Sequence, residues 1–260
     1  MDLSQQHDLA PARANELVFR AGVRRDDHVI EIGPGTGAIT GALLATGATV
    51  QAVERDAARV AGLRQRFSQE LTSGRLLLTE GDAVTWRPAL PPGWRVVANP
   101  PFNLTAALLR QWLIDTAEPP VAIDLVLQRE AADKFAGSID VPGAHTRSSA
   151  LVALAGTPRI AGLLRRDDVS PPSRVDLCTW AFRRHAKAPA PETLAITDRL
   201  LAIAFAGPRT VAEALRGVAS TVQLRRQGAE HGWNPADHPR AVPPAAWLPL
   251  AELLRMCGKI

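Results

Sequence analysis

The sequence predicts an α/β protein with a mostly parallel, doubly wound sheet, followed by a small all-helical domain. Short apolar runs alternate with helical patterns from about 27 to 128, as in parallel sheets. A glycine-rich turn joins the first of these runs to a helix, and the composition shifts after a proline-bearing linker at 185–193. At 260 residues, the chain exceeds a single domain of ~150 residues. We therefore expect a first domain at 1–185 and a second at 190–260.

Each element of the first domain follows from its own pattern. Five short apolar runs predict strands at 28–33, 48–54, 75–81, 94–100 and 121–128. Apolar residues at helical spacing predict helices at 38–47, 56–67 and 105–113.

Two further strands are expected after a loop at about 137–148, bringing the predicted sheet to seven. The segments are 148–156 and 174–182, and we expect them to form an antiparallel edge of the sheet. Beyond the linker only helical patterns occur, at 192–205, 210–222 and 244–256.

Several classes of protein are disfavoured by the composition. The N-terminus lacks the basic flank and apolar run of a signal peptide, and no run of ~18 uncharged apolar residues occurs. The two cysteines, Cys178 and Cys257, are isolated, and the six histidines are scattered. We expect a monomeric cytoplasmic protein that has no contact with a membrane, no disulfide and no metal site.

The basic residues are unevenly distributed. Residues 1–142 hold 14 Lys and Arg against 17 Asp and Glu, whereas residues 143–260 hold 16 against 9. The net charge is therefore −3 in the first part and +7 in the second. A basic second half suits nucleic acid, whose phosphates supply much of the affinity, although arginines spread over a solvated face would give the same count.

The first strand runs into Gly33-Pro34-Gly35-Thr36-Gly37 and then into a helix. This arrangement brings backbone N–H groups and a helix N-terminus to a ligand, and glycine lets the ligand approach closely. A similar turn also occurs in dinucleotide-binding domains. Glu54 ends the second strand, where a carboxylate can accept hydrogen bonds from ribose hydroxyls. Asp82 follows the third strand, and acids at three successive strand ends, beginning with Glu31, are typical of methyltransferases.

The fourth strand ends in Asn99-Pro100-Pro101-Phe102, which suits methylation of a planar amine. Such a nitrogen is a poor nucleophile because its lone pair is delocalised. The Asn99 side-chain oxygen and the Pro100 carbonyl could accept both of its N–H bonds, and the two prolines stiffen the loop. Phe102 offers a flat face on which a base can stack. The alternative is an ordinary turn with Phe102 in the core.

Taken in order, these motifs resemble the ribosomal RNA adenine N6-methyltransferases of the Erm and KsgA group over nearly the whole chain. Gln6-His7-Asp8-Leu9 is similar to the family's N-terminal motif, and the segments VIEIGPGTGAIT (29–40), VERD (53–56) and EGDA (80–83) to its cofactor segments. NPPFNLTAALL (99–109) is similar to its reacting-group loop. Two later segments, 169–184 and 205–217, also resemble family motifs.

The resemblance implies a class I, Rossmann-like fold, S-adenosylmethionine as the cofactor and ribosomal RNA as the partner, with the helical domain binding RNA. The cofactor contacts that it implies are His7, Leu9, Gly33, Gly35, Glu54, Asp82, Ala83 and Asn99. The catalytic residues that it implies are Asn99, Pro100, Pro101 and Phe102.

This sequence departs from the family pattern at three places. Asp8 replaces an aromatic residue of the N-terminal motif, Val169 replaces a phenylalanine, and Gly207-Pro208-Arg209 dilutes a basic cluster. The first and third departures could alter RNA docking. The second could remove one wall of the base pocket and leaves the number of methyl groups open.

The divergent N-terminal motif and the Arg- and Ala-rich composition favour the Erm type. That type modifies an adenine in the peptidyl-transferase region of 23S rRNA and so confers resistance to macrolide-class antibiotics. Three alternatives stay open, namely a KsgA-type 16S rRNA dimethyltransferase, a DNA adenine methyltransferase, and a non-catalytic RNA-binding factor of the same fold. The intact Gly33, Glu54, Asp82 and Asn99 argue against the last of these.

Overall fold

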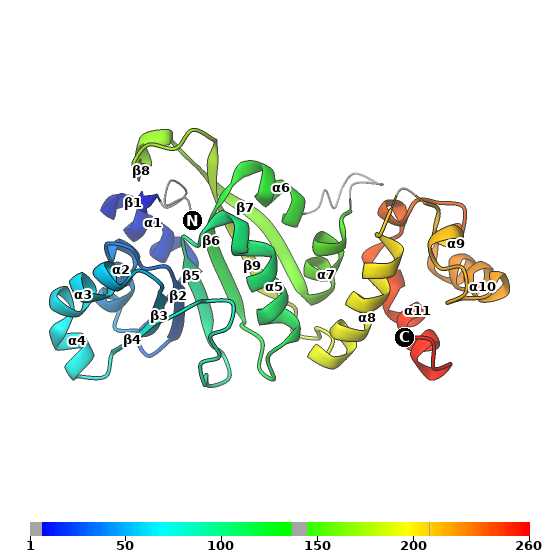
Figure 1. Ribbon diagram of the computed structural model, residues 1–260, viewed down its shortest axis with the longest axis horizontal. Coiled ribbons are helices and arrows are strands. Elements are labelled where there is room, and N and C mark those ends of the chain that lie inside the picture. Colours follow the sequence, from blue (N-terminus) through cyan, green and yellow to red (C-terminus); the bar gives the residue numbers. More distant parts are fainter. Residues whose placement is uncertain (1–6, 137–144, 208) are drawn as a thin grey trace. The chain divides into compact units, whose positions relative to one another are not determined.

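The computed structural model describes residues 7–136, 145–207 and 209–260 (Figure 1). Seven strands form one sheet in the order β4-β3-β2-β5-β6-β9-β7, which confirms the predicted α/β class. The chain divides into two compact units. The first holds residues up to Trp112 together with Glu118–Ala132 and Arg159–Arg183, and the second holds Leu113–Ala117, Asp133–Pro158 and Arg184–Ile260.

Each element has well-defined bounds. The strands are β1 (Asp8–Leu9), β2 (His28–Ile32), β3 (Thr49–Glu54), β4 (Leu76–Glu80), β5 (Arg95–Ala98), β6 (Ala122–Gln128), β7 (Gly156–Leu164), β8 (Val169–Ser170) and β9 (Leu177–Arg184). The α-helices are α1 (Pro11–Ala21), α2 (Ala38–Ala45), α3 (Ala57–Arg66), α4 (Ser68–Thr72), α5 (Thr105–Ile114), α6 (Arg129–Ala136), α7 (Arg147–Ala155), α8 (Pro191–Ala204), α9 (Val211–Ala214), α10 (Thr221–His231) and α11 (Trp247–Met256). Short 3-10 helices span Phe102–Leu104, Arg166–Asp168, Pro239–Ala241 and Pro244–Ala246.

The five strands predicted from short apolar runs all form. β4, β3, β2, β5 and β6 run parallel to one another, so their carboxyl ends meet at one edge of the sheet. β5 and β6 are buried along almost their whole length, as expected for central strands of a parallel sheet covered on both faces. This edge therefore gathers the residues that follow β2, β3, β4 and β5.

The strand expected at 148–156 is wrong, because most of that segment forms helix α7. Thr146 caps the helix by accepting a hydrogen bond from the Ser149 backbone N–H, and the Ser149 hydroxyl accepts one from the Thr146 N–H. This reciprocal cap stabilises a helix start. The apolar run that suggested a strand is instead the buried part of α7.

The seventh strand is β7, which begins where that prediction ended. Its glycine and proline content hid it from the periodicity argument. Pro158 is tolerated because β7 is the last strand of the sheet, where a missing N–H breaks no ladder. The segment 174–182 does contain a strand, β9, and it is antiparallel to β6 as predicted, but it lies inside the sheet rather than at its edge.

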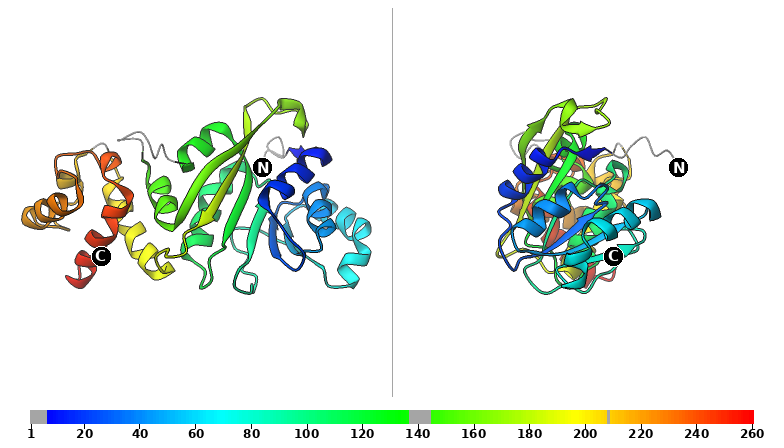
Figure 2. Two further views of the ribbon diagram at one scale, coloured as in Figure 1. Left: turned by 180° about the vertical axis from the view of Figure 1, so that it is seen from behind. Right: turned by 90° about the vertical axis from the view of Figure 1, so that its left-hand side faces the viewer.

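The second unit is helical beyond residue 190, as the sequence predicts (Figure 2, yellow to red). The helix expected at 210–222 is wrong in its length. α9 ends at Ala214, Gly217 has a φ of +83°, and Ser220 caps a new helix, α10. α8 packs against α11, and the buried carboxylate of Asp198 on α8 forms a two-pronged ion pair with Arg147 of α7, at 2.6 and 2.8 Å.

Three features named from the sequence fall partly outside the described residues. They are Gln6 of the N-terminal motif, positions 137–144 of the predicted loop, and Pro208 of the diluted basic cluster.

Candidate active site

The glycine-rich turn after β2 adopts backbone angles that glycine favours. Gly33, Gly35 and Gly37 have φ of +65°, +59° and +85°. A Cβ on Gly37 would lie 2.6 Å from a ring carbon of Phe67, so the start of α2 packs where only glycine fits. The turn that the sequence predicted is therefore required by both backbone conformation and packing.

Glu54 lies at the carboxyl end of β3 with its carboxylate buried. Its Oε2 accepts a hydrogen bond from the Gly35 N–H at 3.2 Å, and its Oε1 accepts from the N–H groups of Arg55 and Asp56 at 2.8 and 3.0 Å. A carboxylate has about four acceptor positions, so capacity for a further donor remains. Glu54 thus ties the β2 turn to the end of β3 and fixes an acceptor between them.

The next strand end carries Asp82 and Ala83, after β4. Asp82 is exposed, and its Oδ1 accepts a hydrogen bond from the Val84 N–H at 2.8 Å. Its main-chain carbonyl accepts one from the Trp86 N–H at 2.9 Å. These bonds hold a tight turn, and they place the Asp82 carboxylate one strand beyond Glu54.

Glu31 lies in β2 beneath the glycine turn and is fully buried. The Thr40 hydroxyl donates to its Oε2 at 2.7 Å, whereas its Oε1 has no hydrogen-bond partner among the described residues. Burial raises the pKa of Glu31 to about 8, and the nearby Glu54 carboxylate adds to the rise. Glu31 is therefore protonated at neutral pH.

Asn99 follows β5 and has a fixed orientation. Its side-chain Nδ2 donates a hydrogen bond to the main-chain carbonyl of His7 at 2.6 Å. Since a carbonyl can only accept, the amide is turned so that Oδ1 is the acceptor left for a ligand. The sequence predicted the acceptor but not the contact that orients it.

Phe102 follows Asn99-Pro100-Pro101 at the start of a short 3-10 helix. Its side chain is half-buried and packs against the hydrophobic core, and its ring centroid lies 6.4 Å from that of His7. The core contact therefore holds the Phe102 ring in place beside His7.

His7 belongs to a strap formed by residues 7–10 and 168–171. His7 Nδ1 donates to the Pro171 carbonyl at 2.6 Å, and β1 pairs antiparallel with β8 (Figure 1). The Ala10 N–H donates to the Asp168 carbonyl at 2.8 Å. The strap joins two segments that resemble family motifs, and no local pattern in either segment predicts that they pair.

Within the strap, Leu9 pairs with Val169, and both side chains are buried in the hydrophobic core. Val169 is the position where the family has phenylalanine. In this chain the smaller side chain contributes to the core under the strap.

Arg59, on α3, is a residue of the site that sequence reasoning missed. Its Nη1 lies 3.3 Å from the Asp8 Oδ1, and the two side chains are 27% and 25% exposed. The partners are 51 positions apart, so no local pattern could have joined them. The replacement of an aromatic residue by Asp8 was the one available signal.

Most of the predicted site residues come together. One small cavity is lined by His7, Asp8, Gly33, Arg59, Asn99, Pro100, Pro101 and Phe102. Gly35 and Glu54 are hydrogen-bonded to each other, and Asp82 and Ala83 lie at the next strand end. Leu9 and Ala83 are buried in the core and do not line this cavity.

These residues fit a nucleoside cofactor such as S-adenosylmethionine. Acceptors stand at the ends of neighbouring strands, and Glu31 keeps an oxygen without a hydrogen-bond partner among the described residues beneath the glycine turn. Within the described ranges, no group of His, Cys, Asp and Glu is arranged to hold a metal. No described helix is long and apolar enough to cross a membrane.

Comparisons with known proteins agree with this geometry. Residues 2–230 match the family described as "Ribosomal RNA adenine dimethylase". The chain is 32% identical to the Ribosomal RNA small subunit methyltransferase A of Bifidobacterium longum subsp. infantis over 276 residues, covering 98% of this chain and 87% of that protein. It is 33% identical to the protein of the same name from Synechococcus sp. over 250 residues, covering 92% and 90%.

Two solved structures are similar in fold. The 23S rRNA methyltransferase ErmE matches with a TM-score of 0.73 at 22% identity, over 95% of this chain and 99% of that chain. A dimethyladenosine transferase from Plasmodium falciparum matches with a TM-score of 0.68 at 22% identity, over 97% and 91%. At this identity the likeness shows the fold alone.

Proposed function

The chain belongs to the ribosomal RNA adenine dimethylase family and is an rRNA adenine-N6 methyltransferase, and from this premise we propose that it methylates N6 of an adenine in 23S rRNA with S-adenosylmethionine as the methyl donor. One observation carries the assignment of the reacting group. The Asn99 Nδ2 is engaged by the His7 carbonyl, which leaves Oδ1 as the side-chain acceptor at the cavity that Asn99 and Phe102 line.

The site residues would act by orienting and polarising the amine. Asn99 Oδ1 and the Pro100 carbonyl would each accept a hydrogen bond from one of the two N6–H groups, which localises the lone pair on the nitrogen. Phe102 stacks on the base, which must be unpaired or flipped out of its helix. The cofactor supplies a methyl group activated by a positive sulfur. With the cofactor bound, the amine oriented by Asn99 and Pro100 would take this methyl group, the electron pair of the broken C–S bond would stay on sulfur, and the methylated nitrogen would lose a proton to solvent.

The cofactor contacts follow the strand order. Asp82 would meet the adenine amino group at the end of β4, and Glu54 the ribose hydroxyls at the end of β3. The glycine turn at Gly33 and Gly35 would lie beside the amino-acid part of the cofactor. The helical part of the chain beyond residue 190, which holds eight Lys and Arg against six Asp and Glu, would bind RNA.

The choice of 23S rRNA is supported by this chain's departures from the family pattern. Asp8 and Val169 both lie in the strap: Asp8 lines the cavity, and Val169 is buried in the core. Modification of 23S rRNA in the peptidyl-transferase region would give resistance to macrolide-class antibiotics. The competing candidate is 16S rRNA, which is favoured by the relatives named small subunit methyltransferase A.

A direct comparison of substrates separates the two candidates. Purified protein with radiolabelled S-adenosylmethionine is offered protein-free 23S rRNA and small ribosomal subunits lacking the modification. The proposal predicts label in 23S rRNA, mapped to one adenine. Label confined to the small subunit would contradict the 23S assignment and favour the competing candidate. No label in either RNA would contradict both.

A further inference from the structure

Two opposite charges lie against the glycine turn of the candidate cofactor site. Asp8 belongs to β1, Arg59 belongs to α3, and their side chains form an ion pair at 3.3 Å. Both line the cavity that Asn99 and Gly33 also line. A Cβ built on Gly35 would meet the Asp8 carboxylate and would lie 2.9 Å from Arg59 Nη1, so both groups touch the backbone of the turn.

The strand order tells which part of the cofactor would reach this pair. The position of the cofactor rests on the proposed function, in which adenine lies at the end of β4, ribose at the end of β3, and the methyl group near Asn99 at the end of β5. β2 lies between β3 and β5 in the sheet. The remaining part of the cofactor, an amino-acid group with an ammonium and a carboxylate, would therefore lie over the turn that follows β2.

We propose that Asp8 and Arg59 form a specificity-determining pair for this amino-acid end of the cofactor. The guanidinium of Arg59 binds the carboxylate of the cofactor, and the carboxylate of Asp8 binds its ammonium. The ion pair between Asp8 and Arg59 therefore separates when the cofactor binds, and each side chain pairs with the opposite charge of the cofactor. The charges are complementary to a zwitterion, and charged hydrogen bonds are the stronger kind. Arg59 is the one cationic side chain among the residues that line this cavity.

A purely structural role for the pair is less well supported. The strap that carries Asp8 is already held by the hydrogen bond from His7 to Pro171, by the β1–β8 ladder and by the bond from Ala10 to Asp168. α3 has its own cap, because Asp56 accepts from the backbone N–H groups of Ala58 and Arg59.

Arg59 is also held in place for this role. The cap at Asp56 fixes the first turn of α3, and Asp56 in turn follows the Glu54 carboxylate that receives its N–H at 3.0 Å. The acceptor assigned to the ribose and the cation assigned to the amino-acid end are therefore positioned by the same short segment.

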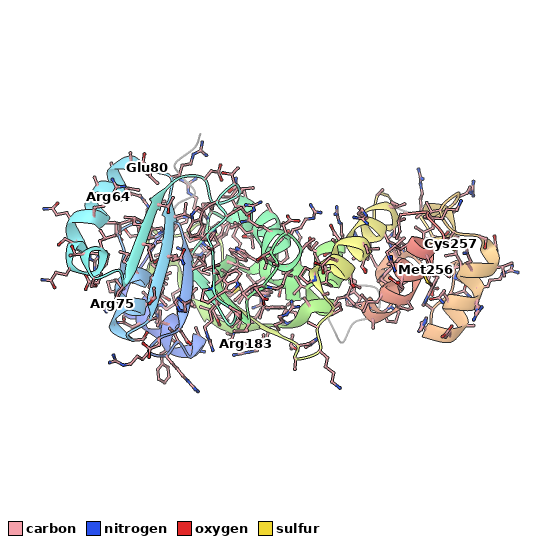
Figure 3. The ribbon with its side chains drawn as sticks, turned by 90° about the horizontal axis from the view of Figure 1, so that it is seen from below. Arg64, Arg75, Glu80, Arg183, Met256 and Cys257 are labelled. Carbon is pink, nitrogen blue, oxygen red and sulfur yellow. The ribbon has the colours of Figure 1, made fainter. Side chains whose placement is uncertain are left out.

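The test uses two ligands that differ only at the amino-acid end. S-adenosylhomocysteine has this end, and 5′-methylthioadenosine has a methyl group in its place. Affinities of the full chain for both ligands are measured by isothermal titration calorimetry for wild type, Arg59→Gln and Asp8→Asn. The control is Arg64→Gln, because Arg64 is an exposed arginine of the same helix that lies at the outside of the molecule (Figure 3).

The pair is expected to discriminate between the ligands. Arg59→Gln and Asp8→Asn should each weaken S-adenosylhomocysteine binding about tenfold, the loss of about one charged hydrogen bond, and leave methylthioadenosine within about twofold. Arg64→Gln should change neither. Equal weakening of both ligands, or no weakening of either, would overturn the pair's role while leaving the proposed methylation intact. If wild type bound neither ligand, the proposed function would fail as well.

A double variant gives an independent readout. Asp8→Arg combined with Arg59→Glu restores an ion pair with the charges exchanged. If Asp8 and Arg59 bind the ammonium and the carboxylate of the ligand, the double variant should bind S-adenosylhomocysteine as weakly as the single variants do. Recovery to the wild-type affinity would show that only the attraction between the two side chains matters, and would overturn the proposal.

Discussion

The side-chain nitrogen of Asn99 donates a hydrogen bond to the main-chain carbonyl of His7, 92 positions earlier in the chain, at 2.6 Å. The residue proposed to polarise the target amine is therefore oriented by the strap and not by its own loop. His7 is in turn held by the Pro171 carbonyl. Docking of the strap and presentation of the Asn99 oxygen are coupled, so a change in either segment of the strap should affect catalysis.

Replacing Glu54 should weaken cofactor binding. Glu54→Gln replaces one carboxylate oxygen by an NH2 group, which cannot accept hydrogen bonds from the three backbone N–H groups around it. The substitution also removes the carboxylate that would accept hydrogen bonds from the ribose hydroxyls. We expect the affinity for S-adenosylhomocysteine, measured by calorimetry, to fall by about tenfold or more.

A neighbouring glutamate supplies the matched control for Glu54. Glu80 pairs with Glu54 in the register of β3 and β4, yet it is exposed (Figure 3). Glu80→Gln should leave the affinity unchanged. Equal losses in the two variants would mean that the general negative charge of this edge, and not the Glu54 contact, controls binding.

Removing the ring of Phe102 should lower the rate of RNA methylation and leave cofactor binding unchanged. Stacking of a base on an aromatic side chain is worth about 1–3 kcal/mol, so Phe102→Leu should lower kcat/KM for RNA by about 5- to 150-fold. The leucine keeps apolar volume against the core that Phe102 contacts. Affinity for S-adenosylhomocysteine should stay within about twofold.

The exposed Phe19 serves as the control for Phe102, because its side chain is 86% exposed on α1. Phe19→Leu should leave kcat/KM for RNA at the wild-type value. A Phe102→Leu enzyme that methylates RNA as fast as wild type would rule out stacking on this ring.

The buried carboxyl of Glu31 should make stability fall as the pH rises. Its pKa is raised from 4.5 to about 8 by burial, so between these values the unfolded chain ionises while the folded protein keeps the proton. The unfolding free energy should therefore decrease by up to about 1.4 kcal/mol per pH unit across this window. The contribution is fully present below pH 4.5 and lost above about pH 8.

Glu31→Gln removes that titration and keeps a neutral acceptor for the Thr40 hydroxyl. Urea unfolding of wild type and variant at pH 5, 6.5 and 8 should show the variant gaining stability over wild type as the pH rises. Glu80→Gln, at an exposed carboxyl, should follow wild type. Parallel pH profiles for wild type and Glu31→Gln would contradict the assignment of a buried proton to Glu31.

Local patterns predicted the parallel strands and their ends well. β2, β3, β5 and β6 are mostly apolar runs because they are covered on both faces, and each candidate residue after them stands where a parallel sheet places it. The sheet's far edge was not predictable in this way. There α7 is an apolar run with a helix cap at Thr146, and β7 carries Pro158 because an edge strand tolerates it.

The contacts that orient the site were beyond local reasoning. The bond between Asn99 and His7, the pairing of Leu9 with Val169 and the ion pair between Asp8 and Arg59 each join segments at least 51 positions apart. Nothing in the spacing of either segment encodes such a partner. Residue types at strand ends could be assigned from sequence, whereas the direction of each side chain required the fold.

The measurement that tests the central claim most directly is mass spectrometry of nucleosides from rRNA treated with wild type or with Asn99→Ala. We expect wild type to produce N6-methylated adenosine, and Asn99→Ala to form it about 10²- to 10³-fold more slowly, since a lost polar contact to the reacting group costs about that much. S-adenosylhomocysteine binding by the variant, measured in parallel, confirms that the site is folded. Undiminished formation of N6-methyladenosine by Asn99→Ala would contradict the role given to that side chain.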